Sequence, residues 1–244
     1  MAEEKESKKP IVKKKAPLSK KKKLWFQILA PEVFGKAVIG ETLVEESKNM
    51  VGKTVQLSLM NLTGDMKKQN VNVTFRINTV TEGKGQCTVI SYDIAPASIK
   101  RLVRRGRMRI DASFICQTKD GVKIRIKPFL LTAYETKRSI LSSIRKYAIA
   151  FIATYVSKYD YDTVLKDVIS GRLQSGVKES VHCIYPIKIS EIRVLNMEKE
   201  TAVVTVQPHP SMDVEAIIQK GSQKRAPRPR PQRTEEPKPE EPAQ

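Results

Sequence analysis

The chain has 244 residues, with 45 lysines and arginines against 26 aspartates and glutamates, and its formal net charge is +19. A hydrophobic fraction of 40% suffices for a packed core and excludes a chain that is disordered throughout. The longest strongly apolar run, residues 148–156, is far shorter than the ~20 residues of a membrane span, and no secretory signal is recognisable. Three cysteines without CxxC spacing argue against a disulfide framework and a zinc site. We therefore expect a soluble, intracellular protein with no metal, no cofactor and no membrane partner.

The positive charge is spread along the whole chain. Residues 1–23 hold ten lysines against three glutamates, and residues 220–244 hold seven basic against four acidic residues, so about half of the excess falls on residues 24–219. A folded body with that balance repels itself unless a polyanion is near, and nucleic acid is the commonest polyanion. An anionic membrane would need a basic amphipathic helix, which the sequence lacks. A surface that merely keeps the protein soluble remains the alternative.

Both ends of the sequence are expected to be disordered. Residues 1–23 are lysine-rich and have almost nothing apolar to bury. Residues 220–244 are rich in proline, which excludes helix and central strand, and they change from basic to acidic midway.

Between the ends, most of the pattern has a period of two, which predicts strands. Alternating apolar and polar residues cover positions 55–59, 71–77, 86–92, 110–116 and 122–126. Asp120-Gly121 separates the last two runs, and this dipeptide between alternating runs is a strong hairpin signal.

The later part of the chain has apolar residues at three- and four-residue steps, which predicts helices over 135–158, 162–170 and 175–184. A hairpin of residues 187–195 and 201–206 is expected to follow. Strands, then helices, then strands indicate an α+β fold. We predict one body over residues 24–219, antiparallel, β-rich and barrel-like over 24–133, then helical with a closing hairpin over 134–219.

The signals that an enzyme requires are missing. The two histidines, His182 and His209, have no spacing that suggests a shared site. Residues 51–54 read VGKT, like the end of a phosphate-binding loop, but Ser47 stands where that loop needs a glycine. We therefore predict no catalytic residues and no enzyme, with an enzyme acting on RNA kept as a rival class.

The strongest functional signal is the basic stretch SIKRLVRRGRMR at residues 98–109, which has six cations and no acid. Arg101, Arg104 and Arg105 are spaced as on one helical face, and Leu102 and Val103 would face the core. Arginine suits bidentate contacts with phosphate, so RNA contact is the favoured interpretation.

Two further basic features are less specific. The strand over 122–128 places Lys123, Arg125 and Lys127 on one face, where they would follow a phosphate backbone or form a solvated outer face. Arg138 and Arg145 share a stripe of the long helix with Lys137 and Lys146 nearby, and contact with RNA and simple exposure are about equally plausible there.

An aromatic pair, Trp25-Phe26, follows Lys20–Lys23. Such a pair either stacks on RNA bases or, as we expect here, anchors Trp25 in the core at the start of the first strand. Low aromatic content and the absence of RNP, GXXG and zinc-knuckle motifs point to phosphate and shape recognition of folded RNA. The candidate RNA-binding residues are Lys20, Lys21, Lys22, Lys23, Lys100, Arg101, Arg104, Arg105, Arg107, Arg109, Lys123, Arg125, Lys127, Arg138, Arg145 and Lys146.

Several segments together resemble a small-subunit ribosomal protein family of archaea and eukaryotes, called protein one in the current naming and S-three-A-e in the older one. They are WFQILAPEVFGKAVIGET (25–42), VGKTVQLSLMNLTGD (51–65), LVRRGRMRIDA (102–112), TKDG (118–121), KRSILSSIRK (137–146) and CIYPIKISEIRV (183–194). Their order and spacing carry the resemblance, and the compact loops are similar to archaeal members. The proline-rich end departs from the family pattern.

The resemblance implies a structural protein on the platform of the small subunit in the cytoplasm, near the mRNA exit and the 3′ end of the rRNA. Its partners would be small-subunit rRNA, neighbouring platform proteins and mRNA near the exit. It also implies rRNA contact by the cations of residues 100–109. The alternative is a free RNA- or DNA-binding factor, such as a processing or chromatin protein.

Overall fold

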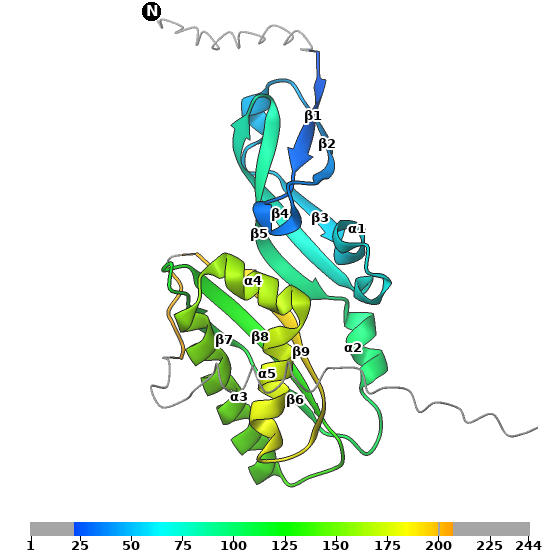
Figure 1. Cartoon of the computed structure of the whole chain (residues 1–244), viewed down its shortest axis with the longest axis vertical. Helices are drawn as coiled ribbons and strands as arrows, with labels where there is room; N and C mark the ends of the chain where they lie inside the picture. Colours follow the sequence, from blue (N-terminus) through cyan, green and yellow to red (C-terminus); the bar gives the residue numbers. More distant parts are fainter. Residues whose placement is uncertain (1–21, 200, 207–244) are drawn as a thin grey trace, which may run out of the picture.

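The computed structural model describes residues 22–199 and 201–206, and these contain nine strands and five α-helices (Figure 1). The ends predicted to be disordered, apart from Lys22 and Lys23, and residues 207–219 of the predicted body lie outside the described residues. The strands are β1 (Leu24–Leu29), β2 (Val38–Val44), β3 (Thr54–Ser58), β4 (Val71–Thr81), β5 (Lys84–Ile94), β6 (Arg109–Asp111), β7 (Phe114–Gln117), β8 (Lys123–Thr132) and β9 (Ile187–Met197). The helices are α1 (Leu59–Thr63), α2 (Pro96–Leu102), α3 (Arg138–Lys158), α4 (Tyr161–Ser170) and α5 (Arg172–His182), with 3-10 turns at Glu32–Phe34, Ser47–Met50 and Met66–Lys68.

Strand β5 joins two halves of the sheet. β4 pairs along the whole of one edge of β5. The other edge pairs with β1 at its beginning, in parallel, and with β9 at its end, antiparallel. The β1–β5 half thus continues into a second half built from β9, β8, β7 and β6 (Figure 1). The α+β prediction is confirmed, and the sheet stays open rather than closing into a barrel.

The alternation of the sequence corresponds to one buried and one exposed face of each strand. Val73, Phe75 and Ile77 are fully buried on β4. The Asp120-Gly121 hairpin is confirmed, because β7 and β8 pair antiparallel and Gly121 has the positive φ of +80° that the turn needs. β6 and β7 pair with β8 in one common register and are separated by Ala112 and Ser113, which lie opposite Pro128 and Lys127. Pro128 has no N–H to donate to the ladder.

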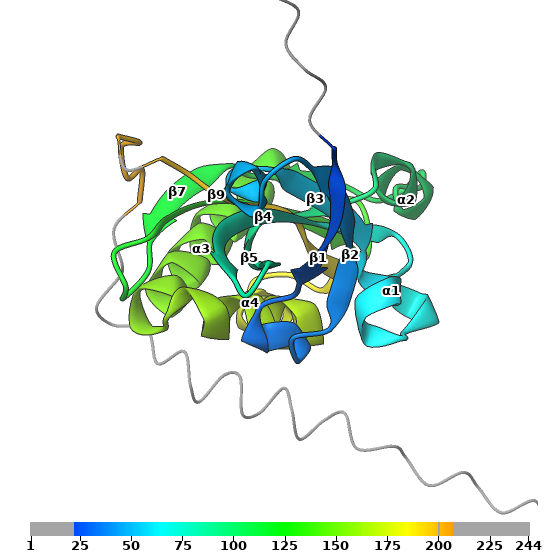
Figure 2. The same cartoon turned by 90° about the horizontal axis from the view of Figure 1, so that it is seen from above.

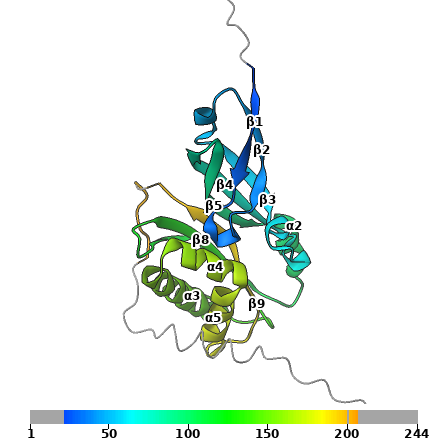
Figure 3. The same cartoon turned by 45° about the horizontal axis from the view of Figure 1, so that its top comes forward.

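Helices α3, α4 and α5 cover one face of the β6–β9 half, which we call its inner face (Figure 3). Ala148, Phe151 and Ile152 of α3 belong to the same core cluster as Ile124 and Ile126 of β8. The Tyr161 hydroxyl of α4 donates to the Val89 carbonyl oxygen at 2.9 Å, which ties this helical layer to β5. One continuous core therefore holds both halves of the sheet.

Two local predictions were wrong. Residues 201–206 do not form the second strand of a closing hairpin, because β5 and β8 already occupy both edges of β9. These residues instead lie against β7, where the Thr205 N–H donates to the Ile115 carbonyl oxygen at 3.0 Å. In addition, α2 ends at Leu102 because Val103 is extended, so Arg101 shares no helical face with Arg104 and Arg105.

Candidate RNA-binding surface

The strands of the β6–β9 half present a polar face opposite the helices, which we call the outer face. On β8, Ile124 and Ile126 are fully buried toward the helices, so the intervening Lys123, Arg125 and Lys127 lie on the outer face. The alternation predicted from the sequence is therefore confirmed for this strand.

Helix α2 packs on the same outer face. Ile99 forms a separate small core with Phe129 and Leu131 of β8, and Leu102 and Val103 pack against it as the sequence predicted. Phe129 is two residues beyond Lys127 and therefore shares its face. This packing brings the cations of residues 100–109 to the same side of the sheet as the basic row of β8.

Arg109 connects the two groups of cations. Its guanidinium carbon lies 5.6 Å from the centroid of the Phe129 ring, a cation–π arrangement. Its Nε also forms an ion pair of 2.5 Å with Asp111 Oδ2. Arg109 thus helps to fix the end of the α2–β6 connection, and its charge is partly neutralised.

The cations of the outer face differ in whether other groups of the protein already form hydrogen bonds or ion pairs with them. Lys123 Nζ donates to the Ala202 carbonyl oxygen at 2.7 Å, and Arg125 Nε pairs with Glu198 Oε1 at 2.5 Å. Within residues 22–199 and 201–206, no ion pair neutralises Lys127 or Arg193. The same holds for Lys100, Arg101, Arg104, Arg105 and Arg107, which are exposed or, for Arg107, half-buried.

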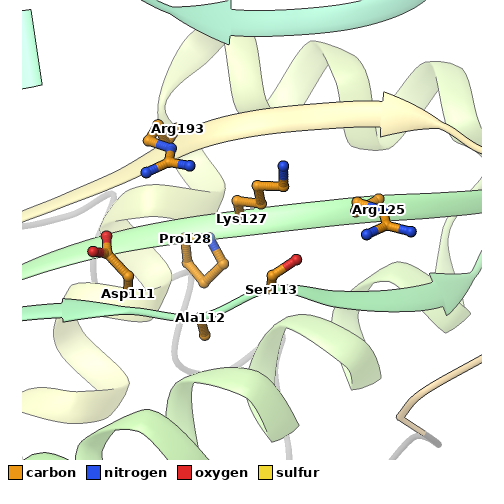
Figure 4. A pocket seen from close by; sticks show the side chains of 7 residues that line it. All are labelled: Asp111, Ala112, Ser113, Arg125, Lys127, Pro128 and Arg193. Carbon is orange, nitrogen blue, oxygen red and sulfur yellow. The ribbon is translucent and has the colours of Figure 1, made fainter. Parts of the chain in front are cut away.

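A hollow of about 410 Å³ opens on the outer face beside these residues (Figure 4). β8 contributes Arg125 and Lys127, β9 contributes Arg193, and the β6–β7 connection contributes the Ser113 hydroxyl next to Asp111. A bulge of β9 opposite Lys127 and Pro128 places Arg193 at this hollow. Cations and a hydroxyl around a shallow hollow can hold a phosphate group.

Sequence reasoning missed Asp111, Ser113 and Arg193 as members of this hollow. Arg193 alternates with Ile192 and Val194, a pattern that places it on an outer face but gives no partner. Its partner strands β5 and β8 lie about 60 to 100 residues earlier in the sequence, and the bulge depends on that pairing.

The remaining candidate residues lie elsewhere. Arg138, Arg145 and Lys146 are exposed on α3, which lies on the inner side of the sheet, away from the outer face. Lys22 and Lys23 are exposed just before β1, at the far end of the other half (Figure 1). Lys20 and Lys21 lie outside the described residues.

Trp25 is not the core anchor that we expected, since 67% of its surface is exposed. Among the described residues, residues 24–27 of β1 pair with β2 and not with β5, and no described element buries the Trp25 side chain. Leu43, its neighbour across the β1–β2 pair, is also exposed.

The described residues include no group of three or more His, Cys, Asp or Glu side chains placed to hold a metal ion. No helix among them has the length and apolar character of a membrane span. Burial raises the pKa of the Cys87 thiol to about 11 and that of Cys116 to about 12, so both thiols stay protonated near neutral pH. Neither is suited to act as a nucleophile.

Comparison with known proteins identifies the family of this chain. Residues 11–201 match the model of the ribosomal S3Ae family. The small ribosomal subunit protein eS1 of Halorubrum lacusprofundi is 31% identical over 198 residues, which cover 81% of this chain and 92% of that protein. The proteins of the same name from Methanothrix thermoacetophila (29% over 202 residues, 83% and 94%) and Sulfurisphaera tokodaii (31% over 182 residues, 75% and 94%) are similar over almost the same length.

The chain therefore belongs to the ribosomal S3Ae family, as the resemblance predicted. Its role is that of a structural ribosomal protein and not of an enzyme.

Proposed function

We propose that the chain is a structural constituent of the small ribosomal subunit that binds folded rRNA with its outer face. The family and the names of the relatives support the ribosomal role. The observation that supports the rRNA contact is the gathering on one face of cations from α2, its following loop, β8 and β9, most of which form no ion pair within the described residues. We further propose, from the resemblance, a place on the platform near the mRNA exit, with platform proteins and mRNA as neighbours, in the cytoplasm.

The outer face would act by neutralising phosphates and by matching the shape of folded RNA. Each phosphate that meets a lysine or arginine releases condensed counterions, which supplies binding free energy. Arg104 and Arg105 lie in a loop held by the Ile99–Phe129 contact, so their guanidinium groups approach the RNA from a defined direction. Lys127, Arg193 and Ser113 would then hold a phosphate in the hollow.

The experiment that tests this proposal is the incorporation of a triple variant, R104A/R105A/K127A, into small subunits. A matched control, K48A/K84A/K166A, removes the same charge from exposed lysines outside the outer face. We expect the first variant to shift from the small-subunit peak to the top of a sucrose gradient at moderate salt, while the control stays with the subunit. Equal incorporation of the two variants would contradict the proposed RNA-binding surface. A wild-type chain that sediments chiefly free of ribosomes would contradict the ribosomal role and favour a free nucleic-acid-binding factor.

A further inference from the structure

The first half of α3 is a second basic surface with a different composition from the outer face. All five charged residues from Lys137 to Lys158 are cations, since no aspartate or glutamate occurs in that stretch. Arg138, Arg145 and Lys146 are exposed, as are the three serines at positions 139, 142 and 143. Within the described part of the chain, no ion pair neutralises these three cations.

This half of the helix is anchored in the core by one face, and its other face is exposed. Ile144 and Ala148 are buried in the main core, and the second half of α3 is buried almost throughout. The serine side chains are short, so they leave room for a phosphate backbone to approach the helix, and their hydroxyls can donate to phosphate oxygens. Lys137 and Arg138 also lie at the positive end of the helix dipole, where a nearby anion relieves an unfavourable arrangement of charge.

The α3 surface and the outer face lie on opposite sides of the molecule. Ile144 packs in the same core as Ile110 and Phe114, whose strands β6 and β7 carry the outer face on their other side. Helix α2 packs through Ile99 in a core separate from the one that contains Ile144 of α3, and in Figure 2 the two helices lie at opposite ends of the view. A helix layer about 10 Å thick and the sheet beneath it therefore separate the two surfaces, so one RNA helix resting on the outer face does not reach α3.

We infer that the exposed half of α3 binds a second segment of rRNA, so that the body bridges two rRNA segments. The inference rests on the proposed function, because it assumes that the outer face holds the first segment. The bridging would fix the distance between two parts of the rRNA at the thickness of the sheet and helix layers, which is a mechanical role beyond charge neutralisation.

Tethered cleavage of rRNA from the two surfaces tests the inference on assembled small subunits. The exposed Cys183 is first changed to serine, and the other two cysteines are buried. An iron chelate that generates hydroxyl radicals is then attached to a new cysteine at S142C on α3 or at A97C on α2, both exposed positions. We expect each probe to cut the rRNA strongly, and we expect the two sets of cuts to fall in different segments.

The outcomes distinguish this inference from the proposed function. Cuts from A97C with none from S142C would contradict the proposed α3 site but not the proposed rRNA contact of the outer face. This result is expected if a protein, and not rRNA, covers α3. Cuts from both probes in the same segment would overturn the bridging. If neither probe cuts the rRNA, the proposed outer-face contact fails as well.

A charge variant completes the test. With R138A/R145A/K146A, we expect the cuts from S142C to weaken at least several-fold while those from A97C persist. Because the three side chains are exposed and form no ion pair within the described residues, the thermal midpoint of the free protein should not fall. Undiminished cuts from S142C would show that the cations of α3 do not hold the RNA.

Discussion

Lys123 and Lys127 lie on the same face of the same strand, yet their side chains have different contacts. Lys123 Nζ is bound to the Ala202 carbonyl oxygen, whereas Lys127 lines the hollow beside Arg193. We expect Lys127→Ala to weaken binding to a small-subunit rRNA fragment and to reduce the slope of log affinity against log salt by about 0.9, the value for one phosphate contact. Filter binding at several salt concentrations measures both quantities.

Lys123→Ala is the matched control for that measurement. Its main expected effect is a lower free energy of unfolding, because the variant cannot form the charge-assisted hydrogen bond to the Ala202 carbonyl oxygen. An equal loss of RNA affinity in the two variants would contradict the distinction between the two lysines.

Glu191 carries a pH-dependent contribution to stability. Glu191 on β9 is the register partner of Phe129 on β8, and burial raises the pKa of its carboxyl above the ordinary value. A carboxyl with a raised pKa in the folded chain favours folding while it is protonated, so its contribution is present at acidic pH and disappears as the pH rises through its folded pKa. We therefore expect Glu191→Gln to raise the free energy of unfolding at neutral pH and to have no effect below about pH 4, where both states are protonated.

Urea unfolding of both proteins at the two pH values measures this difference. Glu45→Gln, at an exposed position, serves as the control and should show little change at either pH. A gain of stability for Glu191→Gln that is the same at both pH values would contradict a role for the titration of this carboxyl.

Helix α2 is short, and its docking, rather than its own hydrogen bonds, holds the basic stretch in place. Its single buried residue, Ile99, contacts Phe129 and Leu131. Because α2 has only seven residues, it would not be stable alone. We expect Ile99→Ala to cost about 2 kcal/mol of stability and also to weaken RNA binding severalfold, although it removes no charge.

Hydrogen exchange of residues 96–102, together with the affinity for an rRNA fragment, checks this prediction. Val164→Ala in α4 is the control, because Val164 is fully buried in the main core under the helices. It should lower stability without changing RNA affinity or exchange in α2. If Ile99→Ala leaves RNA affinity unchanged, the docking of α2 does not position the cations.

At the level of elements, the sequence predicts the strands and turns that depend on neighbouring residues. It does not predict features that depend on pairing between strands far apart in the sequence. Alternation and the Asp120-Gly121 turn were sufficient for β4, β7 and β8, because burial on one face and turn geometry are local properties. The partners of β9 were not predictable in this way, since β5 and β8 pair with it across large sequence separations. For the same reason, the expected hairpin with residues 201–206 and the burial of Trp25 were wrong, and Arg193 went unnoticed.

For the whole molecule, the charge falls into two classes that contribute differently to binding. The folded body holds its arginines and lysines on surfaces of fixed shape, which can discriminate one folded RNA from another. Residues 1–21 add eight lysines. The lysine ammonium is a compact charge without the planar fork of arginine and suits any phosphate. Affinity and selectivity should therefore be separable by mutation.

We expect replacement of all eight lysines by glutamine to lower the affinity for every RNA by a similar factor. The slope of log affinity against log salt should fall by about 0.9 for each phosphate that the variant no longer neutralises. In contrast, R104A/R105A/K127A should weaken binding to the small-subunit rRNA fragment more than binding to an unrelated duplex of equal length. Competition binding with both RNAs at two salt concentrations measures the two effects together. If the glutamine variant binds without selectivity, or the outer-face variant weakens binding to both RNAs equally, the surface of the folded body does not determine which RNA is bound.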